Sequence, residues 1–550
     1  CWKYIDNLSQ GGINKDFNED AVQPAVSVYN NKLYVAWVEN NGSKDVIRVS
    51  RNDDSSWVSV DNNVVNSTSG IITSSATKTS NPFLVLDTNS SITYMLWEDR
   101  VNDVDRIHFA WNSTGSSDDS IGKNWYLISS LNKNNSTNAS SPMGLTKDGK
   151  LYVVWSEMSN TSQIRVRSVK DIQTIDSWLD GGGTTGINKN TDHHAKNPVI
   201  LENLSVFYAA WSEENSTTSD NVSQIRVKKL DRSDNDSNTQ WQSLSGENDV
   251  KGLNYNSNFS ADHPQLIFHN SKLYSTWQEA NSDGKNQIRV AFYQDNLTIT
   301  DNGTKLILDN SSLSHPLNIN RSNCSLNEFD DGENLIYQKL SNSNLDNKSH
   351  YFSNLDNVSL NNNKIYHSTI TNSVIRNSKI INSTISNSKI INSEIYSSEL
   401  DNTTTTSSSE DNSTLVSVEI PDVKSSCWIY IDGGDNSAGL NKIVDHDGNE
   451  NAINPDFIVH NSQLYLTWTQ TKSSASQIRI SLFNDNSTNP NWQIVDRYDN
   501  FGSSRFGLNY NTAKDASNPV MASTGSKLFT LWSEFDNKSN SQLRVVENQM

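Results

Sequence analysis

Three features are scarce in this sequence: cysteine, long apolar runs and positive charge. With only three cysteines among 550 residues, the chain is not a small scaffold held together by many disulfides. No apolar run approaches the roughly 18 residues that a transmembrane helix needs. The formal net charge of -19 leaves little basic surface for nucleic acid or for an anionic membrane. We therefore expect no transmembrane segment and no nucleic-acid partner.

Asn-X-Ser/Thr sequons are abundant by contrast, and most lie in polar loops between apolar runs. They favour an extracellular, N-glycosylated protein at the cell surface, although Asn- and Ser-rich loops also generate sequons that are never modified. The chain starts at Cys1 without an initiator methionine or a leader, so we expect a processed or partial chain. The candidate glycosylation sites are Asn41, Asn66, Asn89, Asn112, Asn135, Asn160, Asn215, Asn221, Asn302, Asn382, Asn412, Asn486 and Asn537.

A repeated unit occupies nearly the whole length of the chain. Its clearest copy, Lys150 to Val166, has two runs of alternating β-branched and aromatic residues around a polar segment, which predicts an antiparallel hairpin. An Ala-x-x-Pro strand precedes the hairpin, and a strand with a second Trp follows it. The first strands begin at Pro24, Pro82, Pro142, Pro198, Pro264, Pro455 and Pro519, and the second strands end at Trp37, Trp97, Trp155, Trp211, Trp277, Trp468 and Trp532. The third strands carry Arg48, Arg106, Arg165, Arg226, Arg289, Arg479 and Arg544, and the fourth are marked by Trp57, Trp125, Trp178, Trp241, Trp428 and Trp492.

The last unit has no fourth strand of its own, and the N-terminal segment supplies one. Cys1-Trp2-Lys-Tyr-Ile-Asp6 matches Cys427-Trp428-Ile-Tyr-Ile-Asp432, which marks the fourth strand of the fifth unit. The sequence therefore predicts an all-β fold, a seven-bladed β-propeller of four-stranded blades closed by the N-terminal strand.

The fifth unit is interrupted between its third and fourth strands. We expect blades one to five, with the closing strand, over residues 1–295, an insertion over 296–426, and the rest of the propeller over 427–550. Apolar residues recur within the insertion at a strict five-residue spacing, with Ser two positions before most of them: Leu355, Leu360, Ile365, Ile370, Ile375, Ile380, Ile385, Ile390, Ile395 and Leu400. This pattern resembles the pentapeptide-repeat family, with Ile for its usual central Leu and Ser for its usual Ala. The resemblance implies a short right-handed quadrilateral β-helix at about 340–400.

The Trp, Glu and Arg of the hairpin are the first candidates for a site. Trp155, Glu157 and Arg165 have the same parity, so we expect one face of the hairpin to carry them, with the guanidinium beside the indole and paired with the carboxylate. Because the Arg recurs in every unit, we interpret this set as a structural ladder.

A recurring Gly-Leu/Ile-Asn motif precedes several blades, at Gly12, Gly186, Gly252, Gly439 and Gly507. Its repetition favours a turn in which Gly supplies a positive φ and Asn caps its own backbone. Ligand binding by these loops is the alternative interpretation.

A weak calcium candidate and the cysteines complete the possible sites. Asp445, Asp447, Asn449 and Glu450 resemble part of a calcium loop but lack its remaining positions, so an acidic surface loop is the alternative. A Cys324–Cys427 disulfide would close a loop of about a hundred residues and stabilise the insertion by about 4 kcal/mol. Cys1 is a candidate for lipid modification or an intermolecular bridge, and packing in the closing strand is the plainer interpretation.

Catalytic signatures are not apparent, since no nucleophile elbow, phosphate loop or triad spacing occurs. We expect no enzyme, no catalytic residue and no cofactor apart from the calcium candidate. The Leu-Tyr-x-x-Trp-x-Glu repeat with sequon-rich loops resembles propeller modules of prokaryotic, particularly archaeal, surface and S-layer-type proteins. The resemblance implies a structural subunit of a surface layer, sheath or filament that self-associates through propeller and solenoid contacts. A carbohydrate-binding adhesin, with surface glycans as partners, is the alternative, and a glycosidase ranks last.

Overall fold

The computed structural model describes most of the chain, which divides into two compact units. The propeller unit is Cys1–Phe292 with Ile431–Met550, and the inserted unit is Tyr293–Tyr430. The described residues are 2–6, 12–53, 56–61, 70–71, 76–87, 92–113, 125–128, 130–171, 174–215, 222–233, 237–244, 252–301, the strands and short links between 306 and 411 named below, 425–432, 439–443, 450–471, 475–484, 491–496 and 507–549. Among them, no helix has the length and apolar character that crossing a membrane requires.

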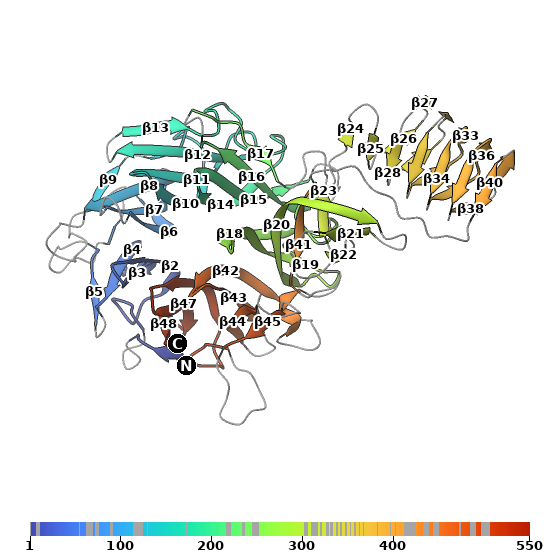
Figure 1. Ribbon diagram of the computed structural model, residues 1–550. Helices are drawn as coiled ribbons and strands as arrows, with labels where there is room; N and C mark the ends of the chain where they lie inside the picture. The colour runs from blue at the N-terminus through green and yellow to red at the C-terminus, as the bar shows by residue number, and fades with distance from the viewer. Residues whose placement is uncertain are drawn as a thin grey trace, which may run out of the picture. The chain divides into compact units, whose positions relative to one another are not determined.

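Seven antiparallel sheets surround the axis of the propeller unit, and the first strands of successive blades contact one another around the ring (Figure 1). The first and second blades are β2 (Ala21–Tyr29), β3 (Lys32–Asn40), β4 (Asp45–Asn52), β5 (Trp57–Ser59), then β6 (Lys78–Asp87), β7 (Ile92–Val101), β8 (Val104–Ser113) and β9 (Tyr126–Ile128). The third and fourth are β10 (Ala139–Lys147), β11 (Lys150–Met158), β12 (Ser162–Asp171), β13 (Thr174–Trp178), then β14 (Ala195–Asn203), β15 (Val206–Glu214), β16 (Ser223–Asp231) and β17 (Gln242–Ser243).

The remaining blades follow the same order. The fifth has β18 (Ala261–His269), β19 (Lys272–Ala280) and β20 (Asn286–Asp301), and β20 pairs with β41 (Ser425–Tyr430). The sixth has β42 (Ala452–His460), β43 (Gln463–Thr471), β44 (Ser476–Asn484) and β45 (Asn491–Ile494), preceded by the 3-10 helix η2 (Leu440–Ile443). The seventh has β46 (Ala516–Ser523), β47 (Lys527–Phe535) and β48 (Ser541–Gln549), and β1 (Trp2–Tyr4) completes it by pairing Trp2 with Asn548 and Tyr4 with Val546. The predicted all-β, seven-bladed propeller is confirmed.

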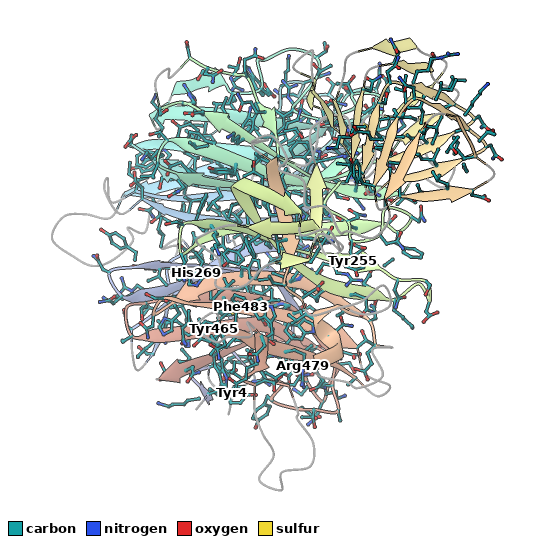
Figure 2. All side chains as sticks on the ribbon, turned by 45° about the vertical axis from the view of Figure 1, so that its right-hand side comes forward. Tyr4, Tyr255, His269, Tyr465, Arg479 and Phe483 are labelled. Carbon is teal, nitrogen blue, oxygen red and sulfur yellow. The ribbon has the colours of Figure 1, made fainter. Side chains whose placement is uncertain are left out.

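Both faces of each central strand are buried, because every blade packs between two others. On β11, Val153 and Trp155 pack into a cluster with Leu96 of the second blade, whereas Val154 faces the fourth blade and packs with Trp211. Aromatic contacts fill other seams: the ring centroids of Tyr274 and Phe483, from the fifth and sixth blades, lie 6.5 Å apart. Figure 2 labels Phe483 among the side chains of the propeller unit. Successive side chains of a central strand therefore contact the preceding and the following blade in turn. Neither face of the strand is polar, because both are buried.

The third-strand arginines do not all hold one register. Trp155 lies opposite Arg165, but Trp97 lies opposite His108, and Arg106 lies opposite Asp99. The prediction that Arg106 fills the repeated position is therefore wrong, because β8 is shifted by two residues relative to the expected alignment. His108 stacks on Trp97 instead, with their ring centroids 5.9 Å apart.

The Gly-Leu/Ile-Asn motif has a different physical cause from the predicted one. A Cβ on Gly186 would lie 2.1 Å from the carbonyl oxygen of Ile164, so a close backbone approach requires glycine there. Only Gly12, at φ 118°, has a positive φ among the motif glycines. The Asn188 side chain accepts from the Ile164 N–H at 2.8 Å and donates to Ser162 and His193 carbonyls, so it links strands rather than capping itself.

From β25 to β40, the short strands of the inserted unit pair in parallel, whereas β24 pairs antiparallel with β25. One ladder runs β24 (Phe329–Asp330), β25 (Asn334–Ile336), β28 (Ser349–Tyr351), β31 (Lys364–Tyr366), β34 (Lys379–Ile381), β37 (Glu394–Tyr396), β40 (Ser409–Asp411). The second runs β26 (Lys339–Ser341), β29 (Asn354–Asp356), β32 (Thr369–Thr371), β35 (Thr384–Ser386), β38 (Glu399–Asp401), and the third β27 (Asn344–Asp346), β30 (Ser359–Asn361), β33 (Val374–Arg376), β36 (Lys389–Ile391), β39 (Thr404–Thr406). Outside the ladders lie β21 (Leu306–Asp309), β22 (Leu317–Asn318) and β23 (Ser322–Ser325).

The spacing of this pairing differs from the expected square coil. Ile365 lies opposite Ile380, and Ile380 opposite Ile395, which is a step of 15 residues and not the 20 of four pentapeptides. The quadrilateral arrangement is therefore wrong, because three five-residue segments separate paired strands. The predicted central residues are buried, and Ser hydroxyls bridge the steps, as where Ser378 N–H donates to Ser393 Oγ at 3.1 Å.

Candidate functional site

The residue before the proline of each first strand adopts a left-handed backbone conformation. These seven residues, here called the axial belt, have φ between 50° and 56°: Gln23, Asn81, Ser141, Asn197, His263, Asn454 and Asn518. Each first strand has a register irregularity at this point, so a β-bulge re-aims the side chain. Positive φ is uncommon outside glycine and clusters at functional sites. The axial belt is therefore our candidate site.

Hydrogen bonds connect the axial belt across the blades. Successive links are Gln23 Nε2 to Asn81 Oδ1 (2.9 Å), Asn81 Nδ2 to Glu98 (2.7 Å), Ser141 N–H to Glu98, Ser141 Oγ to Asn197 Oδ1 (3.1 Å), Asn197 Nδ2 to Asp262 (2.8 Å), Asn454 N–H to Gln278 (3.0 Å) and Asn454 Nδ2 to Asn518 (2.7 Å). All seven belt residues are half-buried. The belt thus presents amide and hydroxyl groups that water reaches.

Charged side chains lie beside the axial belt in the fourth, fifth and sixth blades: Lys196, Asp262 and Asp456. Asp262 on β18 accepts from Asn197 and from the His263 N–H, and forms an ion pair with Lys196 at 2.8 Å. Burial raises the pKa of Asp262, but the charges of His263 and Lys196 and the Asn197 amide outweigh it and hold that pKa below its usual value. Burial lowers the pKa of His263, against the attraction of Asp262. Asp262 is therefore ionised at neutral pH, beside the Lys196 ammonium.

Asp456 on the neighbouring strand β42 behaves in the opposite way. Its carboxylate accepts from the Met521 N–H at 2.7 Å. Burial raises the pKa of Asp456 to about 7, since the backbone N–H donors of Met521 and Phe457 offset only part of the desolvation. Asp456 can therefore hold a proton at neutral pH, whereas Asp262 does not.

Glu98 is a third carboxyl group near the belt, at the position between the Trp and the acidic residue of the second blade. The same position holds Val38 in the first blade, Ser156 in the third, Gln278 in the fifth and Thr469 in the sixth. Burial raises the pKa of Glu98, opposed by donors from Ser141, Asn81 and Ser80. Because its oxygens accept from all three, Glu98 links the two belt residues Asn81 and Ser141.

The structure brings together the predicted Trp155, Glu157 and Arg165. The ion-pair partner of Arg165, however, differs from the predicted one. Trp155 Nε1 donates to Glu157 at 2.9 Å, and the backbone N–H groups of Lys133 and Asn134 complete the carboxylate's contacts. Arg165 forms its ion pair with Asp180 at 3.0 Å, and not with Glu157. The expected Arg165–Glu157 pair is wrong, because Asp180, two residues after Trp178, binds the guanidinium instead.

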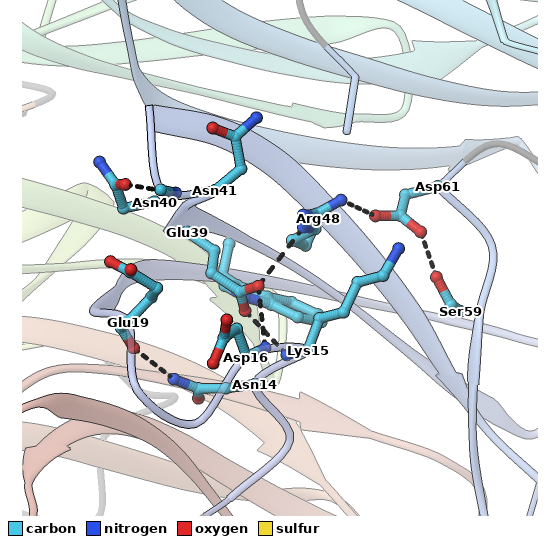
Figure 3. Close-up of polar contacts among 12 residues, drawn as sticks. Asn14, Lys15, Asp16, Glu19, Glu39, Asn40, Asn41, Arg48, Ser59 and Asp61 are labelled. Carbon is cyan, nitrogen blue, oxygen red and sulfur yellow. Dashed lines mark hydrogen bonds and ion pairs between the residues drawn. The ribbon is translucent and has the colours of Figure 1, made fainter. Parts of the chain in front are cut away.

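The first blade differs, because its arginine pairs with both carboxylates: Figure 3 shows Arg48 between Glu39 at 3.4 Å and Asp61 at 3.2 Å, so the predicted Glu–Arg pair forms in this blade. The partners in other blades are Asp6 for Arg544, Asp432 for Arg289 and Asp496 for Arg479. The sequence signal for this contact was present and missed: an Asp lies four residues after the Trp in Trp57 to Asp61 and in Trp492 to Asp496.

Three of the four calcium candidates lie outside the described residues: Asp445, Asp447 and Asn449. Glu450 is described, and Gln470 Nε2 donates to its carboxylate at 2.9 Å. Within the described part of the chain, no group of three or more His, Cys, Asp or Glu side chains is arranged to hold a metal ion. The calcium site stays a prediction.

The backbone register places Cys324 of β23 directly opposite Cys427 of β41. Directly opposed residues of antiparallel strands have Cα atoms about 4.5 to 5.5 Å apart, within the range that a disulfide spans. The disulfide stays a prediction, and so does the state of Cys1, which lies outside the described residues.

The sequons differ in exposure. Asn135, Asn160 and Asn537 are exposed and Asn41 is half-buried, with its side chain accepting from Ser43 and Lys44. Asn112 and Asn215 are buried, at 2% and 4% exposure, so a glycan attached there would not fit the folded blades. The other candidates, which lie outside the described residues, are Asn66, Asn89, Asn221, Asn302, Asn382, Asn412 and Asn486.

No protein-family model and no curated protein sequence matches the chain. Solved structures do match. An exo-1,5-α-L-arabinanase from a bovine ruminal metagenomic library is 13% identical, with 54% of this chain and 98% of that chain covered and a TM-score of 0.29. A thermostable family-43 glycoside hydrolase is 14% identical, with 57% and 99% covered and a TM-score of 0.31. An endo-arabinase from Bacteroides thetaiotaomicron is 14% identical, with 49% and 93% covered and a TM-score of 0.31.

These matches contradict the expectation of a non-enzymatic structural subunit, and we withdraw it. Each of the three structures is a glycoside hydrolase, the class that the sequence analysis ranked last. At this distance the likeness concerns the fold alone, and no substrate is carried over to this chain.

Proposed function

We propose that the propeller unit is a glycoside hydrolase whose substrate binds at the axial belt. One observation carries the proposal: Asp262 and Asp456, on neighbouring first strands, have pKa values displaced in opposite directions. A pair of carboxyl groups with separated pKa values can divide the roles of acid and base. The proposal rests on these residues and not on the distant structural matches.

Asp456 is assigned as the general acid. Its proton passes to the glycosidic oxygen as the bond from that oxygen to the anomeric carbon breaks, and the alcohol leaves. Asp262, ionised, takes a proton from the attacking water, whose oxygen bonds to the anomeric carbon. Lys196 holds the Asp262 carboxylate through their 2.8 Å ion pair, so it positions the base.

The substrate class follows from the belt's composition. Amide and hydroxyl groups from six blades, Asn81, Ser141 and Asn197 among them, offer both donors and acceptors to a ligand. A polyhydroxylated chain presents the same two kinds of group along its length. We therefore assign a neutral polysaccharide or oligosaccharide as substrate.

The test is release of reducing sugar from a panel of neutral polysaccharides and chromogenic glycosides. We expect wild-type activity that falls as the pH rises through about 7, where Asp456 loses its proton. Asp456→Asn and Asp262→Asn should each lower kcat by about a hundredfold or more. Asp231→Asn, at an exposed residue of β16, is the matched control and should keep wild-type kcat. No hydrolysis across the panel, or full activity in Asp456→Asn, would overturn the assignment.

Two further expectations remain proposals. Extracellular localisation with N-glycosylation is supported by the exposure of Asn135, Asn160 and Asn537. Mass spectrometry of the native protein should find glycan on these sequons and none on Asn112. For the inserted unit we propose a β-helix with three strands per coil, supported by its 15-residue pairing step, and solution scattering of the isolated protein can test it.

A further inference from the structure

Two tryptophans of the second and third blades lie outside the repeated positions. Trp111 belongs to β8, whereas the third strands of the other blades carry no tryptophan. Trp178 ends β13 two residues before Asp180, whereas Trp57 lies four residues before the corresponding Asp61. Both Trp111 and Trp178 pack against one buried cluster, which fills the seam between these two blades. They belong to the outer strands of their blades (Figure 1).

The second blade exposes a stacked pair of aromatic rings at this seam. The Tyr126 ring of β9 stacks on the half-buried Trp111, with ring centroids 4.6 Å apart and ring planes inclined by 20°. Tyr126 itself is 52% exposed. The next residue, Leu127, is 45% exposed and points to the other side of β9, because side chains alternate along a strand. Tyr126 therefore presents carbon surface to a ligand at this seam, and Leu127 does not.

The third blade contributes a cation to the same seam. Arg167 of β12 lies directly opposite Trp178 of β13, and its Cζ is 4.3 Å from the centre of the indole ring. Other blades have different residues at these two positions. The corresponding pairs in the first, fourth and sixth blades are Ser50 with Ser59, Lys228 with Ser243, and Ser481 with Ile494. The repeated fold therefore does not require an arginine on a tryptophan here.

Arg167 has no carboxylate partner among the described side chains. Asp180 pairs with Arg165 at 3.0 Å, and Glu157 accepts from the Trp155 indole at 2.9 Å. Burial lowers the pKa of Arg167, because the attraction of these two carboxylates offsets only part of the desolvation. Within this half-buried residue, Nε is enclosed without a hydrogen-bond partner, whereas the terminal Nη1 and Nη2 are not enclosed. The end of the guanidinium is therefore within reach of a ligand.

A further cation lies close to the same indole ring. The Lys133 ammonium is 5.8 Å from the centre of the Trp178 ring and contacts the carbonyl oxygens of Gly182 and Gly183. With the two arginines, three cations lie over this ring, against the two carboxylates that act on Arg167. The formal net charge of the whole chain is -19, so this local excess of positive charge contrasts with the rest of the protein. It favours an anionic ligand.

We propose that the outer seam, formed by Trp111, Tyr126, Arg167 and Trp178, binds an oligosaccharide of acidic sugars. A carboxylate of the ligand accepts from Nη1 and Nη2 of Arg167, since the planar guanidinium matches the geometry of a carboxylate. The C–H face of a sugar ring packs on Tyr126. The excess of positive charge favours this ligand over a neutral oligosaccharide, and the exposed ring favours it over an inorganic anion. The outer seam shares no residue with the axial belt, so this inference does not rest on hydrolysis there.

The test is calorimetric titration of the full chain with a trimer of galacturonic acid, and with a trimer of galactose as its neutral counterpart. We expect the acidic trimer to bind about tenfold or more tightly than the neutral one, and to bind more weakly as salt screens the ion pair. Arg167→Gln should weaken binding of the acidic trimer about tenfold or more, because the ion pair is lost. Lys228→Gln removes the cation at the matching position of the fourth blade. It is the matched control and should bind as wild type does.

A second variant tests the aromatic contact at an exposed residue. Tyr126→Ala should weaken binding of the acidic trimer about fivefold, whereas Leu127→Ala, on the other side of β9, should leave it unchanged. Asp456→Asn should also leave this binding unchanged even where it abolishes hydrolysis, which separates the outer seam from the axial belt. The inference fails if the acidic trimer does not bind at millimolar concentration or binds no more tightly than the neutral trimer. It also fails if Arg167→Gln binds as tightly as Lys228→Gln.

Discussion

Two features recur around the propeller axis, the Trp–Glu–Arg contacts of the second and third strands, here called the node, and the axial belt, and they recur in different ways. At the Trp–Glu–Arg node the residues recur: Trp155, Glu157 and their counterparts make the same hydrogen bond in the first, third, fourth, fifth and seventh blades. At the axial belt the backbone recurs, with φ near 50° in every blade, but the side chain varies from Ser141 to His263. A constant side chain marks a packing requirement, whereas a constant backbone with a varied side chain is a scaffold on which a site can be built.

The largest effect should come from the node. Glu157→Ala leaves the Trp155 indole and two backbone N–H groups without their acceptor, and should lower the free energy of unfolding by about 3 to 5 kcal/mol. Urea denaturation measures it. Glu157→Gln is the control and should lose less, since the sixth blade carries Gln470 at this position and Trp468 still donates to it at 3.3 Å. Equal losses in the two variants would show that charge, and not the hydrogen bonds, matters.

A smaller but clear loss is expected where backbones approach closely. Gly186→Ala places a methyl group 2.1 Å from the Ile164 carbonyl oxygen and should cost about 1 to 3 kcal/mol. Gly525→Ala is the control, because nothing lies within 4 Å of its added Cβ. Chemical denaturation of both variants measures the difference, and similar stability in the two would contradict the close approach.

At the belt, Asp456 should make stability depend on pH. Its folded pKa of about 7 is above the ordinary aspartate value of 3.8, so folding favours the protonated form. This contribution is complete below pH 3.8 and is lost as the pH rises through 7, by about 1.4 kcal/mol per pH unit within that window. Asp456→Asn should flatten the dependence in denaturation curves recorded from pH 4 to 8. An unchanged slope would place the raised pKa elsewhere.

The smallest effect on stability should come from a belt side chain. Asn518→Gly relieves the left-handed conformation at φ 53° but removes the acceptor of the 2.7 Å bond from Asn454. These effects oppose each other, so we expect a net change within about 1 kcal/mol. Substrate affinity should nonetheless fall in titrations with an inactive Asp456→Asn background. A loss of stability as large as that of Glu157→Ala would erase the distinction between belt and node.

The periodic features of the chain were predictable because they repeat. Seven Pro and seven Trp positions were enough for the blade number, and the likeness of the Trp2 and Trp428 segments was enough for the closing strand. The five-residue period of the insertion identified the buried row from Leu355 to Ile395. The period did not determine how many five-residue segments separate paired strands, because a five-residue repeat is compatible with three or with four.

Sequence alone determined which residues recur, since alternation and spacing are properties of one strand and its turn. Only the tertiary structure decided which residues from different strands meet: Arg165 with Asp180, and Gly186 under the Ile164 carbonyl. The raised pKa of Asp456 and the meeting of Trp111 and Trp178 at one seam arise in the same way. Burial and the distance between blades produce them, and neither quantity is written in the local order of residues.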